Sequence, residues 1–103
     1  MVEKSTAIES AKAFVNTCIA NGLPITEAFL FGSYSKGEQR EYSDIDLAII
    51  SDVFTFDFIE NNHKTALINY HYPDIEVHHF STTAFKNETP FIAEIKRTGI
   101  KVY

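Results

Sequence analysis

Two short motifs in this sequence bring together residues that suit a nucleotide and a metal ion. Gly32 and Ser33 follow the apolar segment 27–31, and ten residues later come Asp44 and Asp46. A glycine lets a ligand approach the backbone closely, and the unpaired N–H groups at the start of a helix attract phosphate oxygens. Neighbouring carboxylates repel each other and favour a bound divalent cation with oxygen ligands. The two motifs therefore predict a site that handles a nucleoside triphosphate together with Mg²⁺.

The two aspartates are expected to lie on one face of a strand. Residues 47–50 are apolar, and side chains two positions apart on a strand project from the same face, with backbones roughly 7 Å apart. Asp44 and Asp46 should therefore converge on one point, while Ile45 turns toward the core.

A third acid fits the same design. Glu76 lies between two apolar residues, as Asp46 does, and we expect it to be the third carboxylate. Asp74 is the other candidate, but it follows Pro73, which places it at the entrance of a strand. Three carboxylates can hold two metal ions about 3.5 to 4 Å apart, one at an attacking hydroxyl and one at the phosphates. Such a clamp serves in-line nucleotidyl transfer.

The elements that position these acids can be predicted from periodicity and from turn residues. We expect a small mixed sheet with helices packed on one side, in an α+β (α/β two-layer) arrangement. The expected helices begin at Ser5 or Thr6, at Ser33, at Thr55 or Asp57, and at Thr89, and end near Asn21, Gly37, Tyr70 and Gly99. The expected strands are 27–31, 46–51, 74–80 and 100–103, with a polar connection or short turn at 81–83.

The composition predicts one domain spanning residues 1–103, with 45% hydrophobic residues to fill a core. The net charge is -5 and the Lys and Arg residues are scattered, so nucleic acid is not an expected ligand. Cys18 is the only cysteine, and neither a signal peptide nor a membrane-spanning stretch is visible. We therefore expect a reduced, cytoplasmic protein with no membrane contact.

Other residues have weaker functional interpretations. His78 shares a strand face with Glu76 and is a candidate for the border of the pocket, although packing or exposure is the default for a histidine. Lys36 is expected to face solvent more than phosphate. Phe54, Phe56 and Phe58 favour a core or a partner interface, and they mark a docking surface if they are exposed.

The two motifs and their spacing resemble the signature of the minimal nucleotidyltransferases, a branch of the DNA polymerase β-like superfamily. The matching residues are Gly32-Ser33, Lys36-Gly37 and Asp44-Ile45-Asp46. The resemblance covers nearly the whole chain, because that family also has a leading helix, a third acidic strand and an ending similar to residues 90–103.

The resemblance implies the polymerase β-like fold and roles for five residues. Gly32 and Ser33 would hold the triphosphate, and Asp44, Asp46 and the third acid would bind catalytic Mg²⁺. The third acid of the family is usually Asp, so Glu76 is a departure that moves the carboxylate by about one bond length and loosens the near-octahedral geometry that Mg²⁺ requires.

Three functions stay open at this stage. In the first, the chain transfers AMP from ATP to a hydroxyl group of a partner protein. The resemblance implies a helical partner for it, a HEPN-type toxin or a substrate-binding subunit, with this chain as the antitoxin. In the second, the chain binds a nucleotide or a partner without turnover. In the third, the acceptor is a small molecule such as an aminoglycoside, which requires a pocket from a homo-oligomer or a second subunit.

Overall fold

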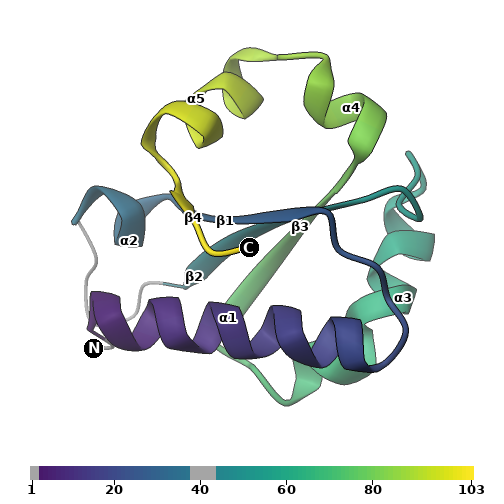
Figure 1. Ribbon diagram of the computed structural model, residues 1–103, viewed down its shortest axis with the longest axis horizontal. Coiled ribbons are helices and arrows are strands. Elements are labelled where there is room, and N and C mark those ends of the chain that lie inside the picture. Colours follow the sequence, from purple (N-terminus) through teal and green to yellow (C-terminus); the bar gives the residue numbers. More distant parts are fainter. Residues whose placement is uncertain (1–2, 38–43) are drawn as a thin grey trace.

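The structure is a computed structural model, and it describes residues 3–37 and 44–103 (Figure 1). Segment 38–43, which joins the two motifs, lies outside the described residues. The helices are α1 (Lys4–Ala20), α2 (Ser33–Lys36), α3 (Phe58–Tyr70), α4 (Thr82–Lys86) and α5 (Pro90–Thr98). The strands are β1 (Glu27–Phe31), β2 (Ile45–Ser51), β3 (Ile75–Ser81) and β4 (Ile100–Lys101).

The four strands form one mixed sheet in the order β3-β2-β1-β4. β1 runs antiparallel to both β2 and β4, while β2 and β3 are parallel and are joined through α3. The expected α+β class and mixed sheet are therefore confirmed. The parallel register places Asp46 directly beside Glu76, and the antiparallel register places Phe31 beside Asp46.

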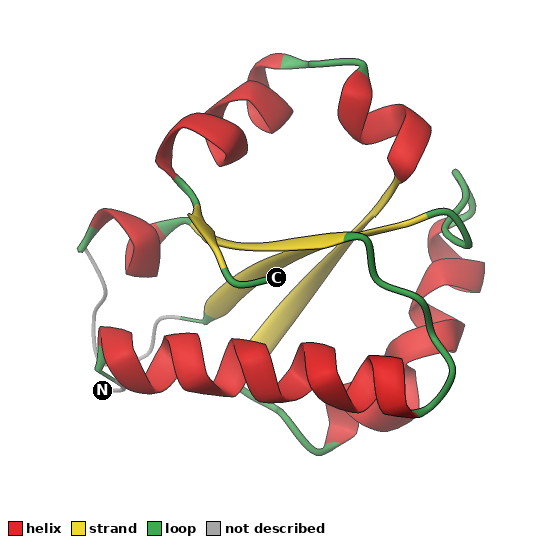
Figure 2. Ribbon diagram, viewed as in Figure 1, coloured by secondary structure: helices red, strands yellow, loops and turns green. Residues whose placement is uncertain are grey.

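Helices cover both faces of the sheet, whereas the sequence predicted helices on one side only (Figure 2). The reason lies in β1, which is apolar on both faces. Ala28 and Leu30 belong to the core under α1, which also contains Phe14 and Cys18. Phe29 and the other second-face residues form a separate core with α4 and α5, which contribute Phe85, Ile92 and Ile95.

Side-chain caps explain where several helices begin. Asp57 accepts the Glu60 N–H at 3.0 Å at the start of α3, and Thr89 accepts the Ile92 N–H at 3.2 Å at the start of α5. Ser81 accepts the Ala84 N–H at 3.0 Å, so the segment predicted as a polar connection begins a helix, α4.

Two further expectations concern α1 and membranes. The helix begins at Lys4 after Glu3, which makes no side-chain cap, so the predicted cap at Ser5 or Thr6 is wrong. Cys18 of α1 is buried, and burial raises its pKa to about 11. Among the described helices, none combines the length and apolar character of a membrane span.

Candidate active site

The turn between β1 and α2 has a backbone that requires glycine. Gly32 has a φ of 74° and a ψ of -145°, which side chains other than glycine rarely adopt. A Cβ atom at this position would lie 2.5 Å from Oδ2 of Asp46. The missing side chain therefore lets the Asp46 carboxylate lie against the turn. Ser33 follows as the first residue of α2, and Gly37 ends that short helix, as predicted.

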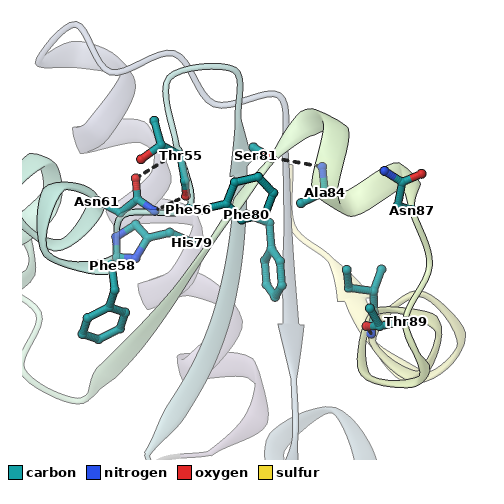
Figure 3. A pocket seen from close by; sticks show the side chains of 11 residues that line it. Thr55, Phe56, Phe58, Asn61, His79, Phe80, Ser81, Ala84, Asn87 and Thr89 are labelled. Carbon is teal, nitrogen blue, oxygen red and sulfur yellow. Dashed lines mark hydrogen bonds between the residues drawn. The ribbon is translucent and has the colours of Figure 1, made fainter.

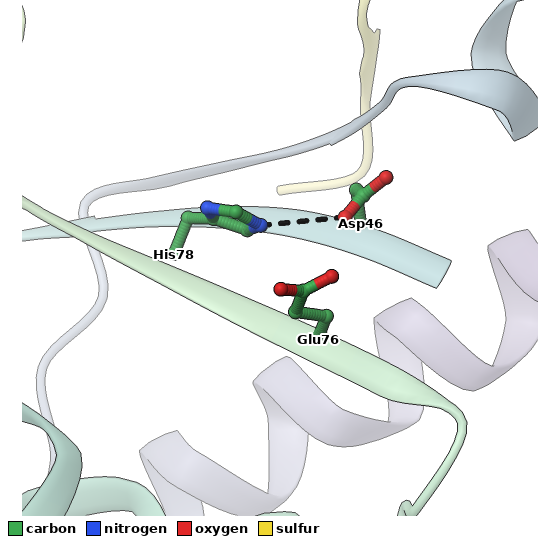
Figure 4. Close-up of side chains that lie close together, drawn as sticks. All are labelled: Asp46, Glu76 and His78. Carbon is green, nitrogen blue, oxygen red and sulfur yellow. Dashed lines mark hydrogen bonds and ion pairs between the residues drawn. The ribbon is translucent and has the colours of Figure 1, made fainter. Parts of the chain in front are cut away.

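Asp46, Glu76 and His78 bring their side chains to one place on the sheet (Figure 4). Each offers one ligand atom, and these atoms all lie within 4.8 Å of one another. Strand geometry produces the cluster, because Glu76 pairs with Asp46 across the parallel strands and His78 lies two residues further along the same face of β3. Two carboxylates and an imidazole are a donor set that suits a divalent cation.

His78 completes this cluster, whereas the sequence indicated it only as a candidate for the border of the pocket. Its Nε2 lies 3.3 Å from Oδ1 of Asp46, slightly longer than a typical hydrogen bond from an N–H to a carboxylate oxygen. Its ring packs edge-on against Phe31, with centroids 4.9 Å apart, and lies 6.4 Å from the ring of Phe91. The available indication was the shared strand face with Glu76, which is a property of any residue two positions along a strand.

Asp44 does not join the cluster. The residue is exposed and precedes β2, which begins at Ile45. The Ile45 N–H donates to the carbonyl of Asp74 at 2.8 Å, and Asp74 itself lies at the entrance of β3, as predicted. The side chain of Asp44 instead lines an open hollow that Glu76 and His78 also line.

Lys36 is paired with a residue of α5. Its Nζ donates to Oε1 of Glu94 at 3.0 Å, and the hydrogen bond and charge of Lys36 lower the pKa of Glu94. This pair lies beside a cavity of about 190 Å³ next to Gly32, which Phe31 and Phe91 also line. Lys36 is exposed, as predicted, and its ammonium group is paired with Glu94 at the edge of the site.

His79 points to the opposite face of the sheet and has a packing role. Its Nε2 lies 2.8 Å from Oγ1 of Thr65, and its ring packs edge-on against Phe54. Burial, together with the nearby charges of His78 and Lys64, lowers its pKa to about 4. His79 is consequently neutral near pH 7 and lies outside the candidate site.

An apolar hollow larger than the cavity beside Gly32 lies where the parallel strands β2 and β3 end, away from Asp46 and Glu76 (Figure 3). Its volume is about 450 Å³, and its lining includes Phe56, Phe58 and Phe80. Phe56 is 94% exposed and Phe58 is 73% exposed, whereas Phe54 is buried. Of the three phenylalanines considered together in the sequence, one therefore belongs to the core and two lie on the surface.

Comparison with known proteins identifies the kind of domain. The family model described as "Nucleotidyltransferase domain" matches residues 12–101. No curated protein matches the chain.

Solved structures show the same fold. A candidate nucleotidyltransferase from Sulfolobus solfataricus superimposes with a TM-score of 0.72 at 12% identity, covering 95% of this chain and 80% of that one. A toxin-antitoxin structure with AMP-PNP gives a TM-score of 0.62 at 20% identity, covering 89% and 72%. A complex of tri-AMPylated Shewanella oneidensis HEPN toxin with MNT antitoxin gives 0.57 at 16% identity, covering 93% and 71%.

Proposed function

The chain belongs to the nucleotidyltransferase domain family, and from this premise we propose that it transfers AMP from ATP to a hydroxyl group of a partner protein. The observation that carries the proposal is that Asp46 and Glu76 lie side by side, with the Asp46 carboxylate against the Gly32 turn. A metal-binding pair of carboxylates next to a phosphate-binding turn is what nucleotidyl transfer requires.

The residues of the cluster would hold a divalent cation, for which we propose Mg²⁺. The fit rests on the donor set and on Gly32, whose missing Cβ leaves room for the Asp46 carboxylate. When bound, such a cation neutralises triphosphate charge and polarises the reacting phosphoryl group. Asp44 lines the same hollow as Glu76, so we propose that it would bind a second cation of the same kind.

The proposed reaction forms one bond and breaks one bond at the α-phosphorus. The acceptor oxygen bonds to that phosphorus, the bond to the oxygen bridging the α- and β-phosphates breaks, and pyrophosphate leaves. Gly32 and Ser33 bind the β- and γ-phosphates through their backbone at the start of α2. Glu76 is the exposed carboxylate of the cluster, so an incoming hydroxyl can reach it and give up its proton there.

We propose a HEPN-type helical toxin as the partner, with this chain as the antitoxin. Two solved structures of the same fold support this choice, one of them a toxin-antitoxin structure with AMP-PNP and the other a complex with a tri-AMPylated HEPN toxin. The net charge of -5 also favours a protein acceptor over nucleic acid. Because ATP is the proposed substrate, we place the reaction in the cytoplasm.

One observation favours a second candidate function, binding of a nucleotide without turnover. Asp44 stands outside the cluster, and Glu76 occupies the position where the family that the chain resembles usually has an aspartate. Both features reduce the number of carboxylates that are well placed for a second cation. They still allow one cation and the triphosphate to bind.

Pyrophosphate release separates the two functions. The purified chain, its helical partner, ATP and Mg²⁺ are incubated, and pyrophosphate and bound ATP are measured for the wild type, for Asp46→Asn, and for Asp52→Asn as an exposed control beyond the end of β2. Release that is lost only in Asp46→Asn supports transfer. Cation-dependent ATP binding without release supports the binding module, and release that Asp46→Asn leaves unchanged overturns the assigned site.

A further inference from the structure

We propose that His78 is a direct metal ligand, and that Asp46, Glu76 and His78 form a mixed oxygen-nitrogen site that binds Mn²⁺ more tightly than Mg²⁺. The inference rests on the proposed function, because it concerns the cation of the same site. On this inference, one residue, His78, determines which cation the site prefers. His78 lies outside the motif that contains the two aspartates.

One ring nitrogen of His78 points toward the carboxylates of Asp46 and Glu76. Nε2 of His78 is the ring atom that lies 3.3 Å from Asp46, and all three ligand atoms of the cluster fall within 4.8 Å of one another. Figure 4 shows the imidazole and the two carboxylates reaching toward the same point. A cation bound among these atoms would therefore meet Nε2 and a carboxylate oxygen from each acid.

The ring has packing partners that hold it in this orientation. Phe31 packs against it at an interplanar angle of 71°, and Phe91 lies on a further side at 60°. The side chains of His78 and Asp46 are 30% and 25% exposed, so both are half-buried and have few alternative positions. A ligand that is already oriented loses less conformational freedom when a metal binds.

The chemistry of the two cations then predicts the preference. Mg²⁺ demands oxygen ligands in a near-octahedral arrangement and gives up its water reluctantly. First-row transition cations accept imidazole as well as carboxylate, and Mn²⁺ combines this tolerance with a use of carboxylate sites similar to that of Mg²⁺. The nitrogen of His78 therefore adds binding energy for Mn²⁺ and little for Mg²⁺.

A different role for His78 competes with this one. The imidazole can stay outside the coordination sphere and donate its Nε2–H to Asp46, which orients a carboxylate that alone touches the metal. The two roles differ in a spectroscopic signature, because a nitrogen bonded to Mn²⁺ couples strongly to its electron spin, whereas a nitrogen outside the coordination sphere couples only weakly.

Electron paramagnetic resonance on the full chain without nucleotide tests the inference. Bound Mn²⁺ is titrated with and without competing Mg²⁺, and pulsed spectra are searched for nitrogen coupling. The variants are His78→Gln and the control His63→Gln, an exposed histidine on α3. We expect strong nitrogen coupling in the wild type and in His63→Gln, its loss in His78→Gln, and at least about tenfold weaker Mn²⁺ binding in that variant. Affinity for Mg²⁺ should change much less.

The outcomes separate this inference from the proposed function. Mn²⁺ that binds without strong nitrogen coupling, or with the same affinity in His78→Gln, overturns the role of His78, and pyrophosphate release in the presence of Mg²⁺ would then still support transfer. Failure of both cations to bind the wild type, together with absence of pyrophosphate release, overturns the metal site and the proposed function together. Circular dichroism of each variant confirms that the chain is folded.

Discussion

Replacement of Gly32 by alanine tests how closely the turn and the carboxylate depend on each other. Two costs are expected. The backbone at φ 74° and ψ -145° lies in a region used almost only by glycine, which costs an alanine on the order of 1 to 3 kcal/mol. The new Cβ would also lie 2.5 Å from Oδ2 of Asp46, so the carboxylate must move. We therefore expect both lower stability and weaker cation binding.

Gly37→Ala is the matched control. Gly37 has a φ of 72°, and a Cβ there would meet nothing within 4 Å. This variant carries a backbone cost, which is smaller because Gly37 lies in the left-handed helical region, and no clash, so it tests whether cation binding depends on the Gly32 turn beside Asp46. Each kcal/mol lowers the Tm of a domain of this size by roughly 4 to 8 °C. Both variants should melt earlier than the wild type, but only Gly32→Ala should lose Mn²⁺ and Mg²⁺ affinity. Equal cation binding by Gly32→Ala and the wild type would refute the reasoning.

Three further predictions concern capping, titration and ligand type. Thr89→Ala removes the cap of α5 and should lower the free energy of unfolding by about 0.5 to 2 kcal/mol, measured in urea. The pKa of His79 is about 4 in the folded chain and 6.5 in the unfolded chain, so the unfolded chain binds more protons between these values. Stability should therefore fall as the pH drops from about 6.5 to 4, and urea midpoints should show a smaller fall in His79→Leu. His78→Asp supplies a third carboxylate and should strengthen Mg²⁺ binding relative to His78→Gln, measured by competition with Mn²⁺.

Much of the fold could be predicted because local sequence controls it. The apolar runs predicted the strands, and Gly32, Gly37, Asp57 and Thr89 predicted where helices begin or end. The helices on the second face were missed, although the alternate phenylalanines of β1 indicated a second apolar surface. That error came from treating a continuous apolar strand as one with a single buried face.

The site could be predicted only in part, because it depends on strand pairing across the chain. Glu76 was chosen for its local setting, and the parallel register places it beside Asp46. Asp44 was expected to share this point, but β2 begins one residue after it. His78 enters the site through the same register, which the sequence does not encode in any short motif. The sequence therefore indicates which residues can carry chemistry, but not which residues lie next to them in the fold.

Transfer from two differently labelled ATP molecules tests the central claim most directly. The chain and its helical partner are incubated with Mg²⁺ and ATP labelled at either the α- or the γ-phosphate, and label on protein is measured for the wild type, Asp46→Asn and Asp52→Asn. The proposed function predicts label from the α-phosphate only, lost in Asp46→Asn and kept in Asp52→Asn. Label from the γ-phosphate, or α-label that persists in Asp46→Asn, would contradict nucleotidyl transfer at this site.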